Sequence, residues 1–242
     1  MPARKNQLIA QQAYNQIAED YAALVDTKAH NAYYERPAML SLLPDVNGLH
    51  VLDAGCGPGV YSQWLAEHGA QVVALDANRK MVRLARKRLG DKAQVLLAEL
   101  GKPLDFAADA SFDLIVAPLV MDYVKDWSVV FKEFHRILKS GGVLLFSMEH
   151  PFGKFYAHQA TSNYYDTDLV HFTWRGFGPQ VDMPSYRRPL NAVLNPLIQA
   201  GLCLDYLLEP LPTEQFRAVE PEDYEKLIRS PGFMCIRAVK RS

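Results

Sequence analysis

The sequence of 242 residues has only three cysteines and lacks any long hydrophobic run. Cys56, Cys203 and Cys235 are widely spaced, which argues against a disulfide framework or a cysteine-rich zinc site and is typical of reduced thiols. No apolar run approaches the roughly 20 residues that span a bilayer, and the polar, basic segment 1–12 lacks the apolar core of a secretory signal. We therefore expect a soluble, cytoplasmic protein with no membrane partner.

The sequence also lacks an excess of charge, because 26 basic and 27 acidic residues give a formal net charge of -1. Without a global positive field there is no general attraction for nucleic acid, so nucleic acid is not the expected partner. The segment 79–90 is a local exception, because its predicted helix carries six basic residues. Its periodicity indicates a solvated face opposite an apolar stripe, with a phosphate-binding patch as the alternative. These residues are Arg79, Lys80, Arg83, Arg86, Lys87 and Arg88.

Hydrophobic residues make up 49% of the chain, which suits the core of one α/β domain of this length. Short apolar runs alternate with stretches of helical periodicity, which predicts βαβ units and a parallel sheet with helices on both faces. The predicted fold is doubly wound α/β, with a mostly parallel seven-stranded sheet and an antiparallel edge strand from the terminal pair. The predicted strands are 49–53, 71–75, 94–98, 112–117, 143–148, 202–208 and 234–239.

We expect one domain, 1–242, built from a helical N-terminal lid (1–44), a ligand-binding core (45–150), an aromatic insertion (151–187) and the rest of the core (188–242). The insertion shows little periodicity, and nine of its 35 residues from 152 to 186 are aromatic. Aromatic residues argue against disorder, and a long irregular segment is usually functional. We interpret it as a lid over the active site, with a small satellite core or a subunit contact as alternatives.

Three glycines follow the first predicted strand. Gly55, Gly57 and Gly59 leave backbone amides accessible to a ligand, and Asp76 ends the next strand 21 residues after Gly55, where a carboxylate can accept both ribose hydroxyls of an adenosine. A dinucleotide fingerprint needs glycine or alanine where the chain has Val60. Asp53 would repel a pyrophosphate but attract a sulfonium or an ammonium. These features favour S-adenosylmethionine (SAM) as the cofactor.

The segment Val51–Gly59 resembles the first motif of class I SAM-dependent methyltransferases. Residues 74–76 resemble the ribose-binding motif of that family, 111–115 its fourth strand and 136–142 the segment before its fifth strand. Residues 13–21 resemble the leading helix of its small-molecule branch. The resemblance implies a Rossmann-like fold, SAM as cofactor and S-adenosylhomocysteine (SAH) as product.

The same resemblance assigns cofactor contacts residue by residue. It implies that Gly55, Cys56 and Gly57 contact the methionine part, that Asp76 binds the ribose and that Met81 flanks the adenine. The family often has an aspartate for the adenine amino group at the end of strand three, and Glu99 is our candidate for that role. The other predicted cofactor contacts are Tyr14, Asp53, Gly59, Ala77, Leu100 and Ala117.

The acceptor is expected beyond the carboxyl ends of the strands, where ligands of doubly wound sheets bind. Asp122 and Glu149 are candidate acceptor-binding residues there. His150 is a candidate proton-transfer group, although a bond to the backbone is the more ordinary role for such a histidine. We expect no metal, because adjacent strand residues such as Glu149 and His150 point to opposite faces.

Further candidates come from the N-terminal helix and the aromatic insertion. Tyr21 is a second catalytic candidate, and Tyr186 and Arg187 are candidate acceptor contacts. Arg187 would clamp an acidic acceptor, with a surface ion pair as the alternative. His158 and His171 are further polar candidates in the insertion.

We predict an enzyme, a SAM-dependent methyltransferase with a small-molecule acceptor, acting as a monomer or homodimer. The alternatives are a tRNA-modifying methyltransferase, suggested by the basic helix, and a SAM-binding protein that has lost catalysis. An NAD-dependent dehydrogenase is a more remote alternative, because the glycine spacing fits a dinucleotide poorly.

Overall fold

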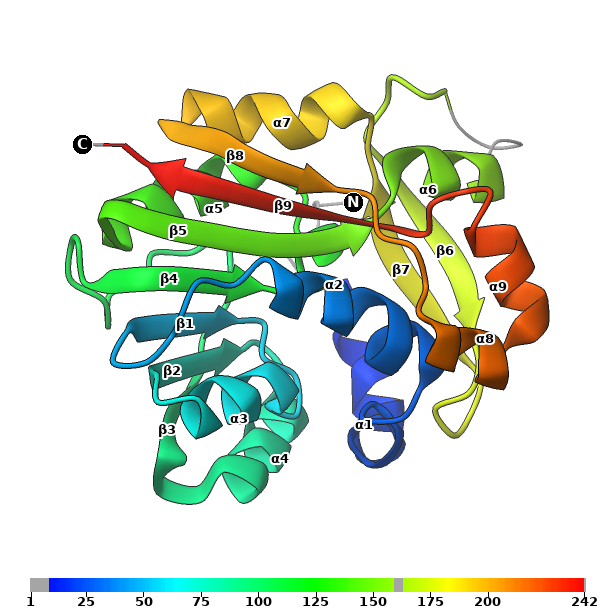
Figure 1. The fold of residues 1–242 in the computed structure, drawn as a ribbon, viewed down its shortest axis with the longest axis horizontal. Coiled ribbons are helices and arrows are strands. Elements are labelled where there is room, and N and C mark those ends of the chain that lie inside the picture. Colours follow the sequence, from blue (N-terminus) through cyan, green and yellow to red (C-terminus); the bar gives the residue numbers. More distant parts are fainter. Residues whose placement is uncertain (1–8, 159–162, 242) are drawn as a thin grey trace, which may run out of the picture.

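The computed structural model of the protein describes residues 9–158 and 163–241, so parts of the predicted lid (1–8) and insertion (159–162) lie outside it. A seven-stranded sheet with the order β3-β2-β1-β4-β5-β9-β8 forms the centre of the molecule (Figure 1). The strands are β1 His50–Ala54, β2 Gln71–Asp76, β3 Ala93–Leu97, β4 Phe112–Ala117, β5 Leu138–Glu149, β8 Leu202–Leu208 and β9 Phe233–Lys240.

The first five strands are parallel, and the terminal pair is antiparallel. β9 runs antiparallel to β5, and β8 pairs antiparallel with β9 at the edge of the sheet. The doubly wound α/β fold with its antiparallel terminal pair is therefore confirmed. β5 begins five residues earlier than predicted, at Leu138, where α5 ends.

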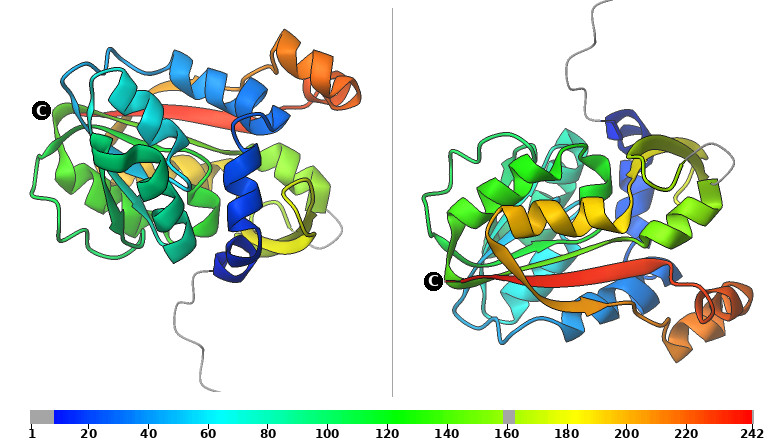
Figure 2. Two further views of the ribbon diagram at one scale, coloured as in Figure 1. Left: turned by 90° about the horizontal axis from the view of Figure 1, so that it is seen from below. Right: turned by 90° about the horizontal axis from the view of Figure 1, so that it is seen from above.

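Helices cover both faces of the sheet because the strands are buried on both sides. α2, α3 and α4 pack on one face, and α5 and α7 pack on the other, as the views along the sheet show (Figure 2). The helices are α1 Gln11–Leu24, α2 Arg36–Ser41, α3 Val60–Glu67, α4 Arg79–Leu89, α5 Trp127–Ile137, α6 Pro151–His158, α7 Leu190–Gln199, α8 Glu214–Val219 and α9 Pro221–Leu227. Single turns lie at η1 Asn31–Glu35, η2 Gly90–Lys92 and η3 Met121–Tyr123.

The insertion after β5 has more regular structure than its sequence pattern indicates. It forms α6 and a two-stranded antiparallel sheet of β6 Asp168–Trp174 and β7 Val181–Arg187. Both faces of this hairpin are partly covered, so apolar and polar residues do not alternate cleanly along it. The expectation of an irregular segment is therefore wrong.

The N-terminal helix α1 lies across the carboxyl ends of the strands and joins the hairpin to α4. Ala13 and Ile17 pack with Phe177 and Met183 of the hairpin in a separate apolar cluster. On its other side, Glu19 forms ion pairs with two cations of α4, and Asp26 pairs with Arg88 at 2.8 Å. Part of the basic face of α4 therefore attaches α1, which the sequence pattern did not indicate.

Candidate functional site

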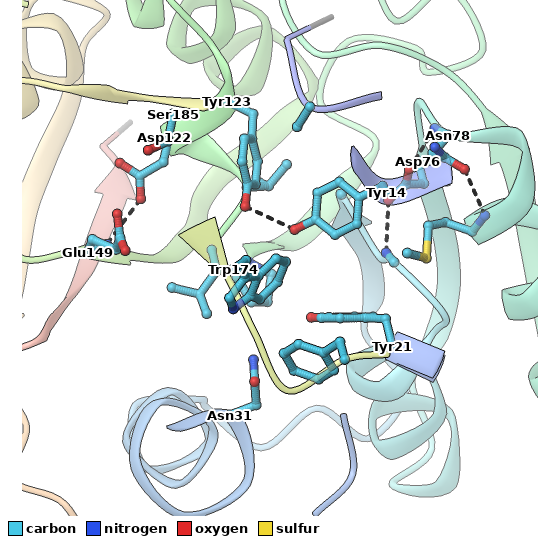
Figure 3. Close-up of a pocket in the computed structure, with 18 of the residues that line it drawn as sticks. Tyr14, Tyr21, Asn31, Asp76, Asn78, Asp122, Tyr123, Glu149, Trp174 and Ser185 are labelled. Carbon is cyan, nitrogen blue, oxygen red and sulfur yellow. Dashed lines mark hydrogen bonds between the residues drawn. The ribbon is translucent and has the colours of Figure 1, made fainter. Parts of the chain in front are cut away.

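A cavity of about 650 Å³ opens at the carboxyl ends of the parallel strands, beneath α1 and the β6–β7 hairpin. Its volume lies within the roughly 300–1,000 Å³ typical of small-molecule sites. Figure 3 shows Asp76 and Asn78 at one end and Asp122 and Glu149 at the other, with aromatic rings between them. The two groups of polar residues predicted from the sequence therefore share one cavity.

The three glycines after β1 have different roles. All three have positive φ angles. A Cβ on Gly55 would lie 2.6 Å from Cβ of Val120, and one on Gly59 would lie 3.2 Å from Leu89 of α4, so close packing requires both. A Cβ on Gly57 would meet only Tyr21, at 4.0 Å, and Gly57 lines the cavity. Gly57 is therefore the position where a ligand can approach the backbone.

Asp76 is held rigidly at the end of β2. Its Oδ2 accepts from the Gly57 amide at 2.9 Å and its Oδ1 from the Asn78 amide at 2.7 Å. Burial raises the pKa of Asp76. The Asn78 side chain caps α4 and donates to Gln11 and Asn15 of α1. The loop, the carboxylate and the N-terminal helix are thus linked through a few hydrogen bonds.

Asp53 is fully buried below the glycine loop, and one of its oxygens has no partner. Oδ2 accepts from the Ser62 hydroxyl at 2.5 Å, whereas Oδ1 is buried without a hydrogen bond. Burial raises the pKa of Asp53 to about 7. A buried carboxylate oxygen without a donor suits a cationic ligand, so this position fits the methionine end of SAM.

The raised pKa of Asp53 predicts a pH-dependent stability difference between the protein and its Asp53→Asn variant. Folded Asp53 holds a proton that unfolded Asp53 releases near pH 3.8, so ionisation costs stability as pH rises towards about 7. Between about pH 5 and about pH 6.5 the wild type should lose about 2 kcal/mol relative to Asp53→Asn. Urea unfolding across this range measures the difference, and exposed Asp91→Asn is the matched control. A difference that does not change with pH would contradict the prediction.

Aromatic side chains form the middle of the cavity. The Tyr14 and Tyr123 hydroxyls lie 3.0 Å apart, and the Trp174 ring packs against the Tyr14 and Tyr21 rings with centroids 5.9 and 5.8 Å away. Burial raises the pKa of Tyr14, Tyr21 and Tyr123 above the usual range, so their phenols stay protonated near neutral pH. Tyr21 therefore lines the cavity with a protonated hydroxyl and is poorly suited to act as a base.

Part of the cavity lining is apolar, with the side chains of Ala77, Met81, Ala98 and Leu100. Glu99, the candidate for the adenine amino group, is not among the described residues that line the cavity, and its carboxylate lies 2.5 Å from Lys102 Nζ. The structure thus places Ala98 and Leu100 at the cavity, whereas the Glu99 carboxylate pairs with Lys102.

The opposite end of the cavity is polar and partly buried. Asp122 and Glu149 line it, and the Glu149 amide donates to Asp122 Oδ2 at 3.1 Å. Lys154 of α6 lies behind them, with Nζ 3.3 Å from Asp122 and 2.5 Å from Glu149. Ser185 of β7 also lines this end. The sequence pattern gave no signal for Lys154 or Ser185, because both come from the insertion and reach this end only through the tertiary fold.

Four residues predicted for the acceptor side do not line the cavity. Arg187 is fully buried, because its guanidinium donates to the carbonyls of residues 163, 164 and 166 and pairs with Asp168 at 2.8 Å. Arg187 therefore stabilises the insertion from inside and is not placed to bind an acceptor in the cavity. Tyr186 pairs with Leu169 in the hairpin. His171 binds Asp182 on the exposed hairpin surface, and neither His158 nor His171 lines the cavity.

His150 also lies outside the cavity. Its ring is buried, and Nε2 lies 2.7 Å from Glu209 Oε1 while Nδ1 accepts from the Phe152 amide at 3.3 Å. Both ring nitrogens are therefore engaged away from the site, because the chain turns into α6 directly after β5. This position gives no support to the proton-transfer role predicted for His150.

We expect His150→Asn to lower stability and to leave cofactor binding and turnover unchanged. Losing the bond to Glu209 should cost about 1–2 kcal/mol of unfolding free energy. A lost catalytic base would instead slow turnover by a factor of about 10²–10⁴. Thermal unfolding and SAH calorimetry measure the two effects, with Glu209→Gln as the control. Slow turnover in a stable, SAH-binding His150→Asn variant would restore the catalytic role.

The remaining predicted cofactor residues lie near the cavity but present little side chain to it. Cys56 lines a small adjoining pocket together with Asp53, and its side chain packs beneath α4. Gly59 and Ala117 do not line the cavity, and Ala117 is fully buried. Their influence on a ligand would therefore act through the backbone and the packing of the loop.

Two features of residues 9–158 and 163–241 bear on other classes of function. Within those ranges, no group of three histidine, cysteine, aspartate or glutamate residues is arranged to hold a metal ion. Nor does that part of the chain contain a helix with the length and apolarity that crossing a bilayer demands.

Comparisons with known proteins agree with the geometry. Residues 52–146 match the family model described as a methyltransferase domain. A crystal structure of a SAM-dependent methyltransferase from Mesorhizobium loti superposes with a TM-score of 0.69 and 27% identity, covering 89% of this chain and 99% of that one. An uncharacterized protein of Haemophilus influenzae is 28% identical over 231 residues, which are 87% of this chain and 88% of that protein.

A malonyl-[acyl-carrier protein] O-methyltransferase of Hamiltonella defensa is 36% identical over 109 residues. The match covers 45% of this chain and only 41% of that protein's length. The similarity to this relative is therefore confined to part of each chain.

Proposed function

We propose that this chain is a SAM-dependent methyltransferase that transfers a methyl group from SAM to a small-molecule acceptor inside the cavity; the match to a methyltransferase-domain model and the similar methyltransferase structure support this. The observation that carries this proposal is that one cavity contains both the glycine loop with Asp76 and, beside them, a space lined by aromatic side chains. When bound, SAM supplies a methyl carbon on a sulfonium, which is already a good leaving group.

The residues fit the cofactor at each part of its structure. Gly57 offers an open backbone position, and Asp76 faces the cavity with its carboxylate fixed by two amides. Met81, Ala98 and Leu100 offer apolar surface for an adenine. We propose that Gly55, Cys56 and Gly57 receive the methionine part through the backbone and that Asp76 accepts the ribose hydroxyls.

The protein's contribution to the reaction is positioning and exclusion of water. α1 and the hairpin cover the strand ends, and Tyr14, Tyr21, Tyr123 and Trp174 surround the middle of the cavity. Such a chamber holds two reactants in line and keeps solvent away from them. The aromatic walls favour an acceptor with an apolar or planar body.

The basic helix α4 does not favour a tRNA substrate. Lys80 and Arg83 pair with Glu19, Arg88 pairs with Asp26, and Arg86 donates to the Val95 carbonyl. A phosphate backbone would compete with these internal partners. Methylation of bulk tRNA that disappears with added salt would nevertheless establish that alternative.

Two measurements test the proposal. Calorimetry should detect micromolar binding of SAH to the purified protein, and its absence would refute the proposal. Incubation with methyl-labelled SAM and a small-molecule library should then transfer label. SAH binding without transfer to any class of acceptor would favour a SAM-binding protein that has lost catalysis.

A further inference from the structure

We infer that the polar end of the cavity binds a protonated amine, which makes amines the acceptor class of this enzyme. The inference rests on the proposed function, because it assumes that the cofactor occupies the Asp76 end. It concerns Asp122, Glu149 and Ser185, which line the other end (Figure 3).

Among the residues that line this end of the cavity, Ser185 and Asp122 each have a buried oxygen without a hydrogen-bond partner. Ser185 is 2% exposed and its Oγ is unpaired, and Asp122 is 4% exposed with Oδ1 unpaired. Asp122 Oδ1 lies 3.3 Å from Lys154 Nζ, but no donor is aligned with it. Buried polar atoms are nearly always paired in folded proteins. Both residues line the cavity, so a ligand group with hydrogen-bond donors could bind to these two unpaired oxygens.

The charge that faces the cavity here is negative. Asp122 and Glu149 line it, whereas the neighbouring cations Lys154 and Arg188 are not among its described lining residues. Lys154 belongs to α6, and its ammonium pairs with both carboxylates. Arg188 donates to the Val124 carbonyl at 2.7 Å and stacks on Trp127 with its Cζ 4.1 Å from the ring centroid. A ligand in the cavity therefore meets the carboxylates first.

An ammonium fits this arrangement better than the alternatives. It brings three donors, enough for Asp122, Glu149 and Ser185 together, and its charge is opposite to that of the two carboxylates. A hydroxyl brings one donor, and a carboxylate would be repelled. Tyr123 and Trp174 stand between this end and Asp76, so the ammonium also approaches aromatic faces, which attract cations.

The same residues suit transfer to nitrogen. A bound ammonium must first lose one proton to expose its lone pair, and Glu149, whose side chain is 38% exposed, can accept that proton and pass it to water. The lone pair then forms the new N–C bond while the C–S bond breaks. The electron pair of that bond stays on sulfur as a neutral thioether, and the methylated nitrogen carries the positive charge. Atoms and charge balance without a further reactant.

Calorimetry on SAH-loaded protein with three probes of similar shape tests the inference. Phenethylamine should bind most tightly, 2-phenylethanol more weakly and phenylacetate most weakly. Ser185→Ala, which removes an oxygen without a protein partner, should weaken phenethylamine binding about 3- to 10-fold and leave SAH binding unchanged. Glu149→Gln should reduce the preference for phenethylamine over 2-phenylethanol about tenfold. Ser111→Ala, at the other end of the sheet, is the matched control.

The outcomes separate this inference from the proposed function. Failure of SAH to bind the wild type would refute the proposed function. With SAH bound, an amine that binds no better than its alcohol or carboxylate analogue, or does not bind, would overturn the amine assignment alone. Lys28 and Arg175 also line the cavity, so tighter binding of phenylacetate would assign an acidic acceptor to those cations instead.

Discussion

Asp76→Ala is expected to weaken SAH binding about 1,000-fold. In the proposed complex, the carboxylate accepts hydrogen bonds from two ribose hydroxyls, each worth about 1.5–3 kcal/mol to a charged acceptor. About 1.4 kcal/mol corresponds to a factor of ten in affinity. Asp76 also fixes the amides of Gly57 and Asn78, so the loss should exceed that of either hydrogen bond alone. Calorimetry with SAH measures the change.

Two control variants separate ligand contact from folding. Asp91→Ala removes an exposed carboxylate of the same kind and should leave SAH affinity unchanged. Asp76→Asn keeps the shape and one acceptor oxygen but sets its amide nitrogen against one of the two backbone amides, so it should lose some stability and bind SAH with intermediate affinity. Equal SAH affinity for a folded Asp76→Ala variant and the wild type would exclude the ribose-binding role of this residue.

The core of the fold was predictable because its signals are local. The apolar runs at 71–75 and 112–117 correspond to β2 and β4, and Asn78 caps α4 at the position where the sequence placed a helix start. Capping, glycine stops and buried strands each depend on a few neighbouring residues. The hairpin β6–β7 was missed because its burial depends on contacts with α1, more than 150 residues earlier.

The difference between local signals and long-range contacts also explains which site residues could be predicted from the sequence. Asp76 and Gly57 were predictable because their geometry follows from the βαβ unit that contains them. His150 and Arg187 were misassigned because position at a strand end does not determine where a side chain points. His150 turns towards Glu209, and Arg187 towards the carbonyls of the preceding loop. Ser185 and Lys154 could be found only from the tertiary structure, since neither belongs to a motif.

Alanine substitutions at Gly55 and Gly57 are expected to impair the protein in different ways: Gly55→Ala mainly lowers stability, and Gly57→Ala mainly weakens SAH binding. Both residues have positive φ, which costs an alanine about 1–2 kcal/mol. At Gly55 the added Cβ also collides with the Val120 side chain, so Gly55→Ala should lose about 3–5 kcal/mol of unfolding free energy in total. At Gly57 the space is open in the protein alone, so stability should fall only by the backbone cost.

SAH binding should be affected directly by Gly57→Ala, although that variant loses little stability. Gly57→Ala remains folded but places a methyl group where we propose that the cofactor meets the backbone, so SAH affinity should fall about 100-fold or more. Gly48→Ala is the matched control, because its φ of +77° is also positive, its Cβ meets nothing within 4 Å and the residue does not line the cavity. Urea unfolding and SAH calorimetry on the three variants resolve the two effects. If Gly57→Ala bound SAH as tightly as Gly48→Ala, the cofactor could not approach the chain at this loop, and the cavity would need a different ligand.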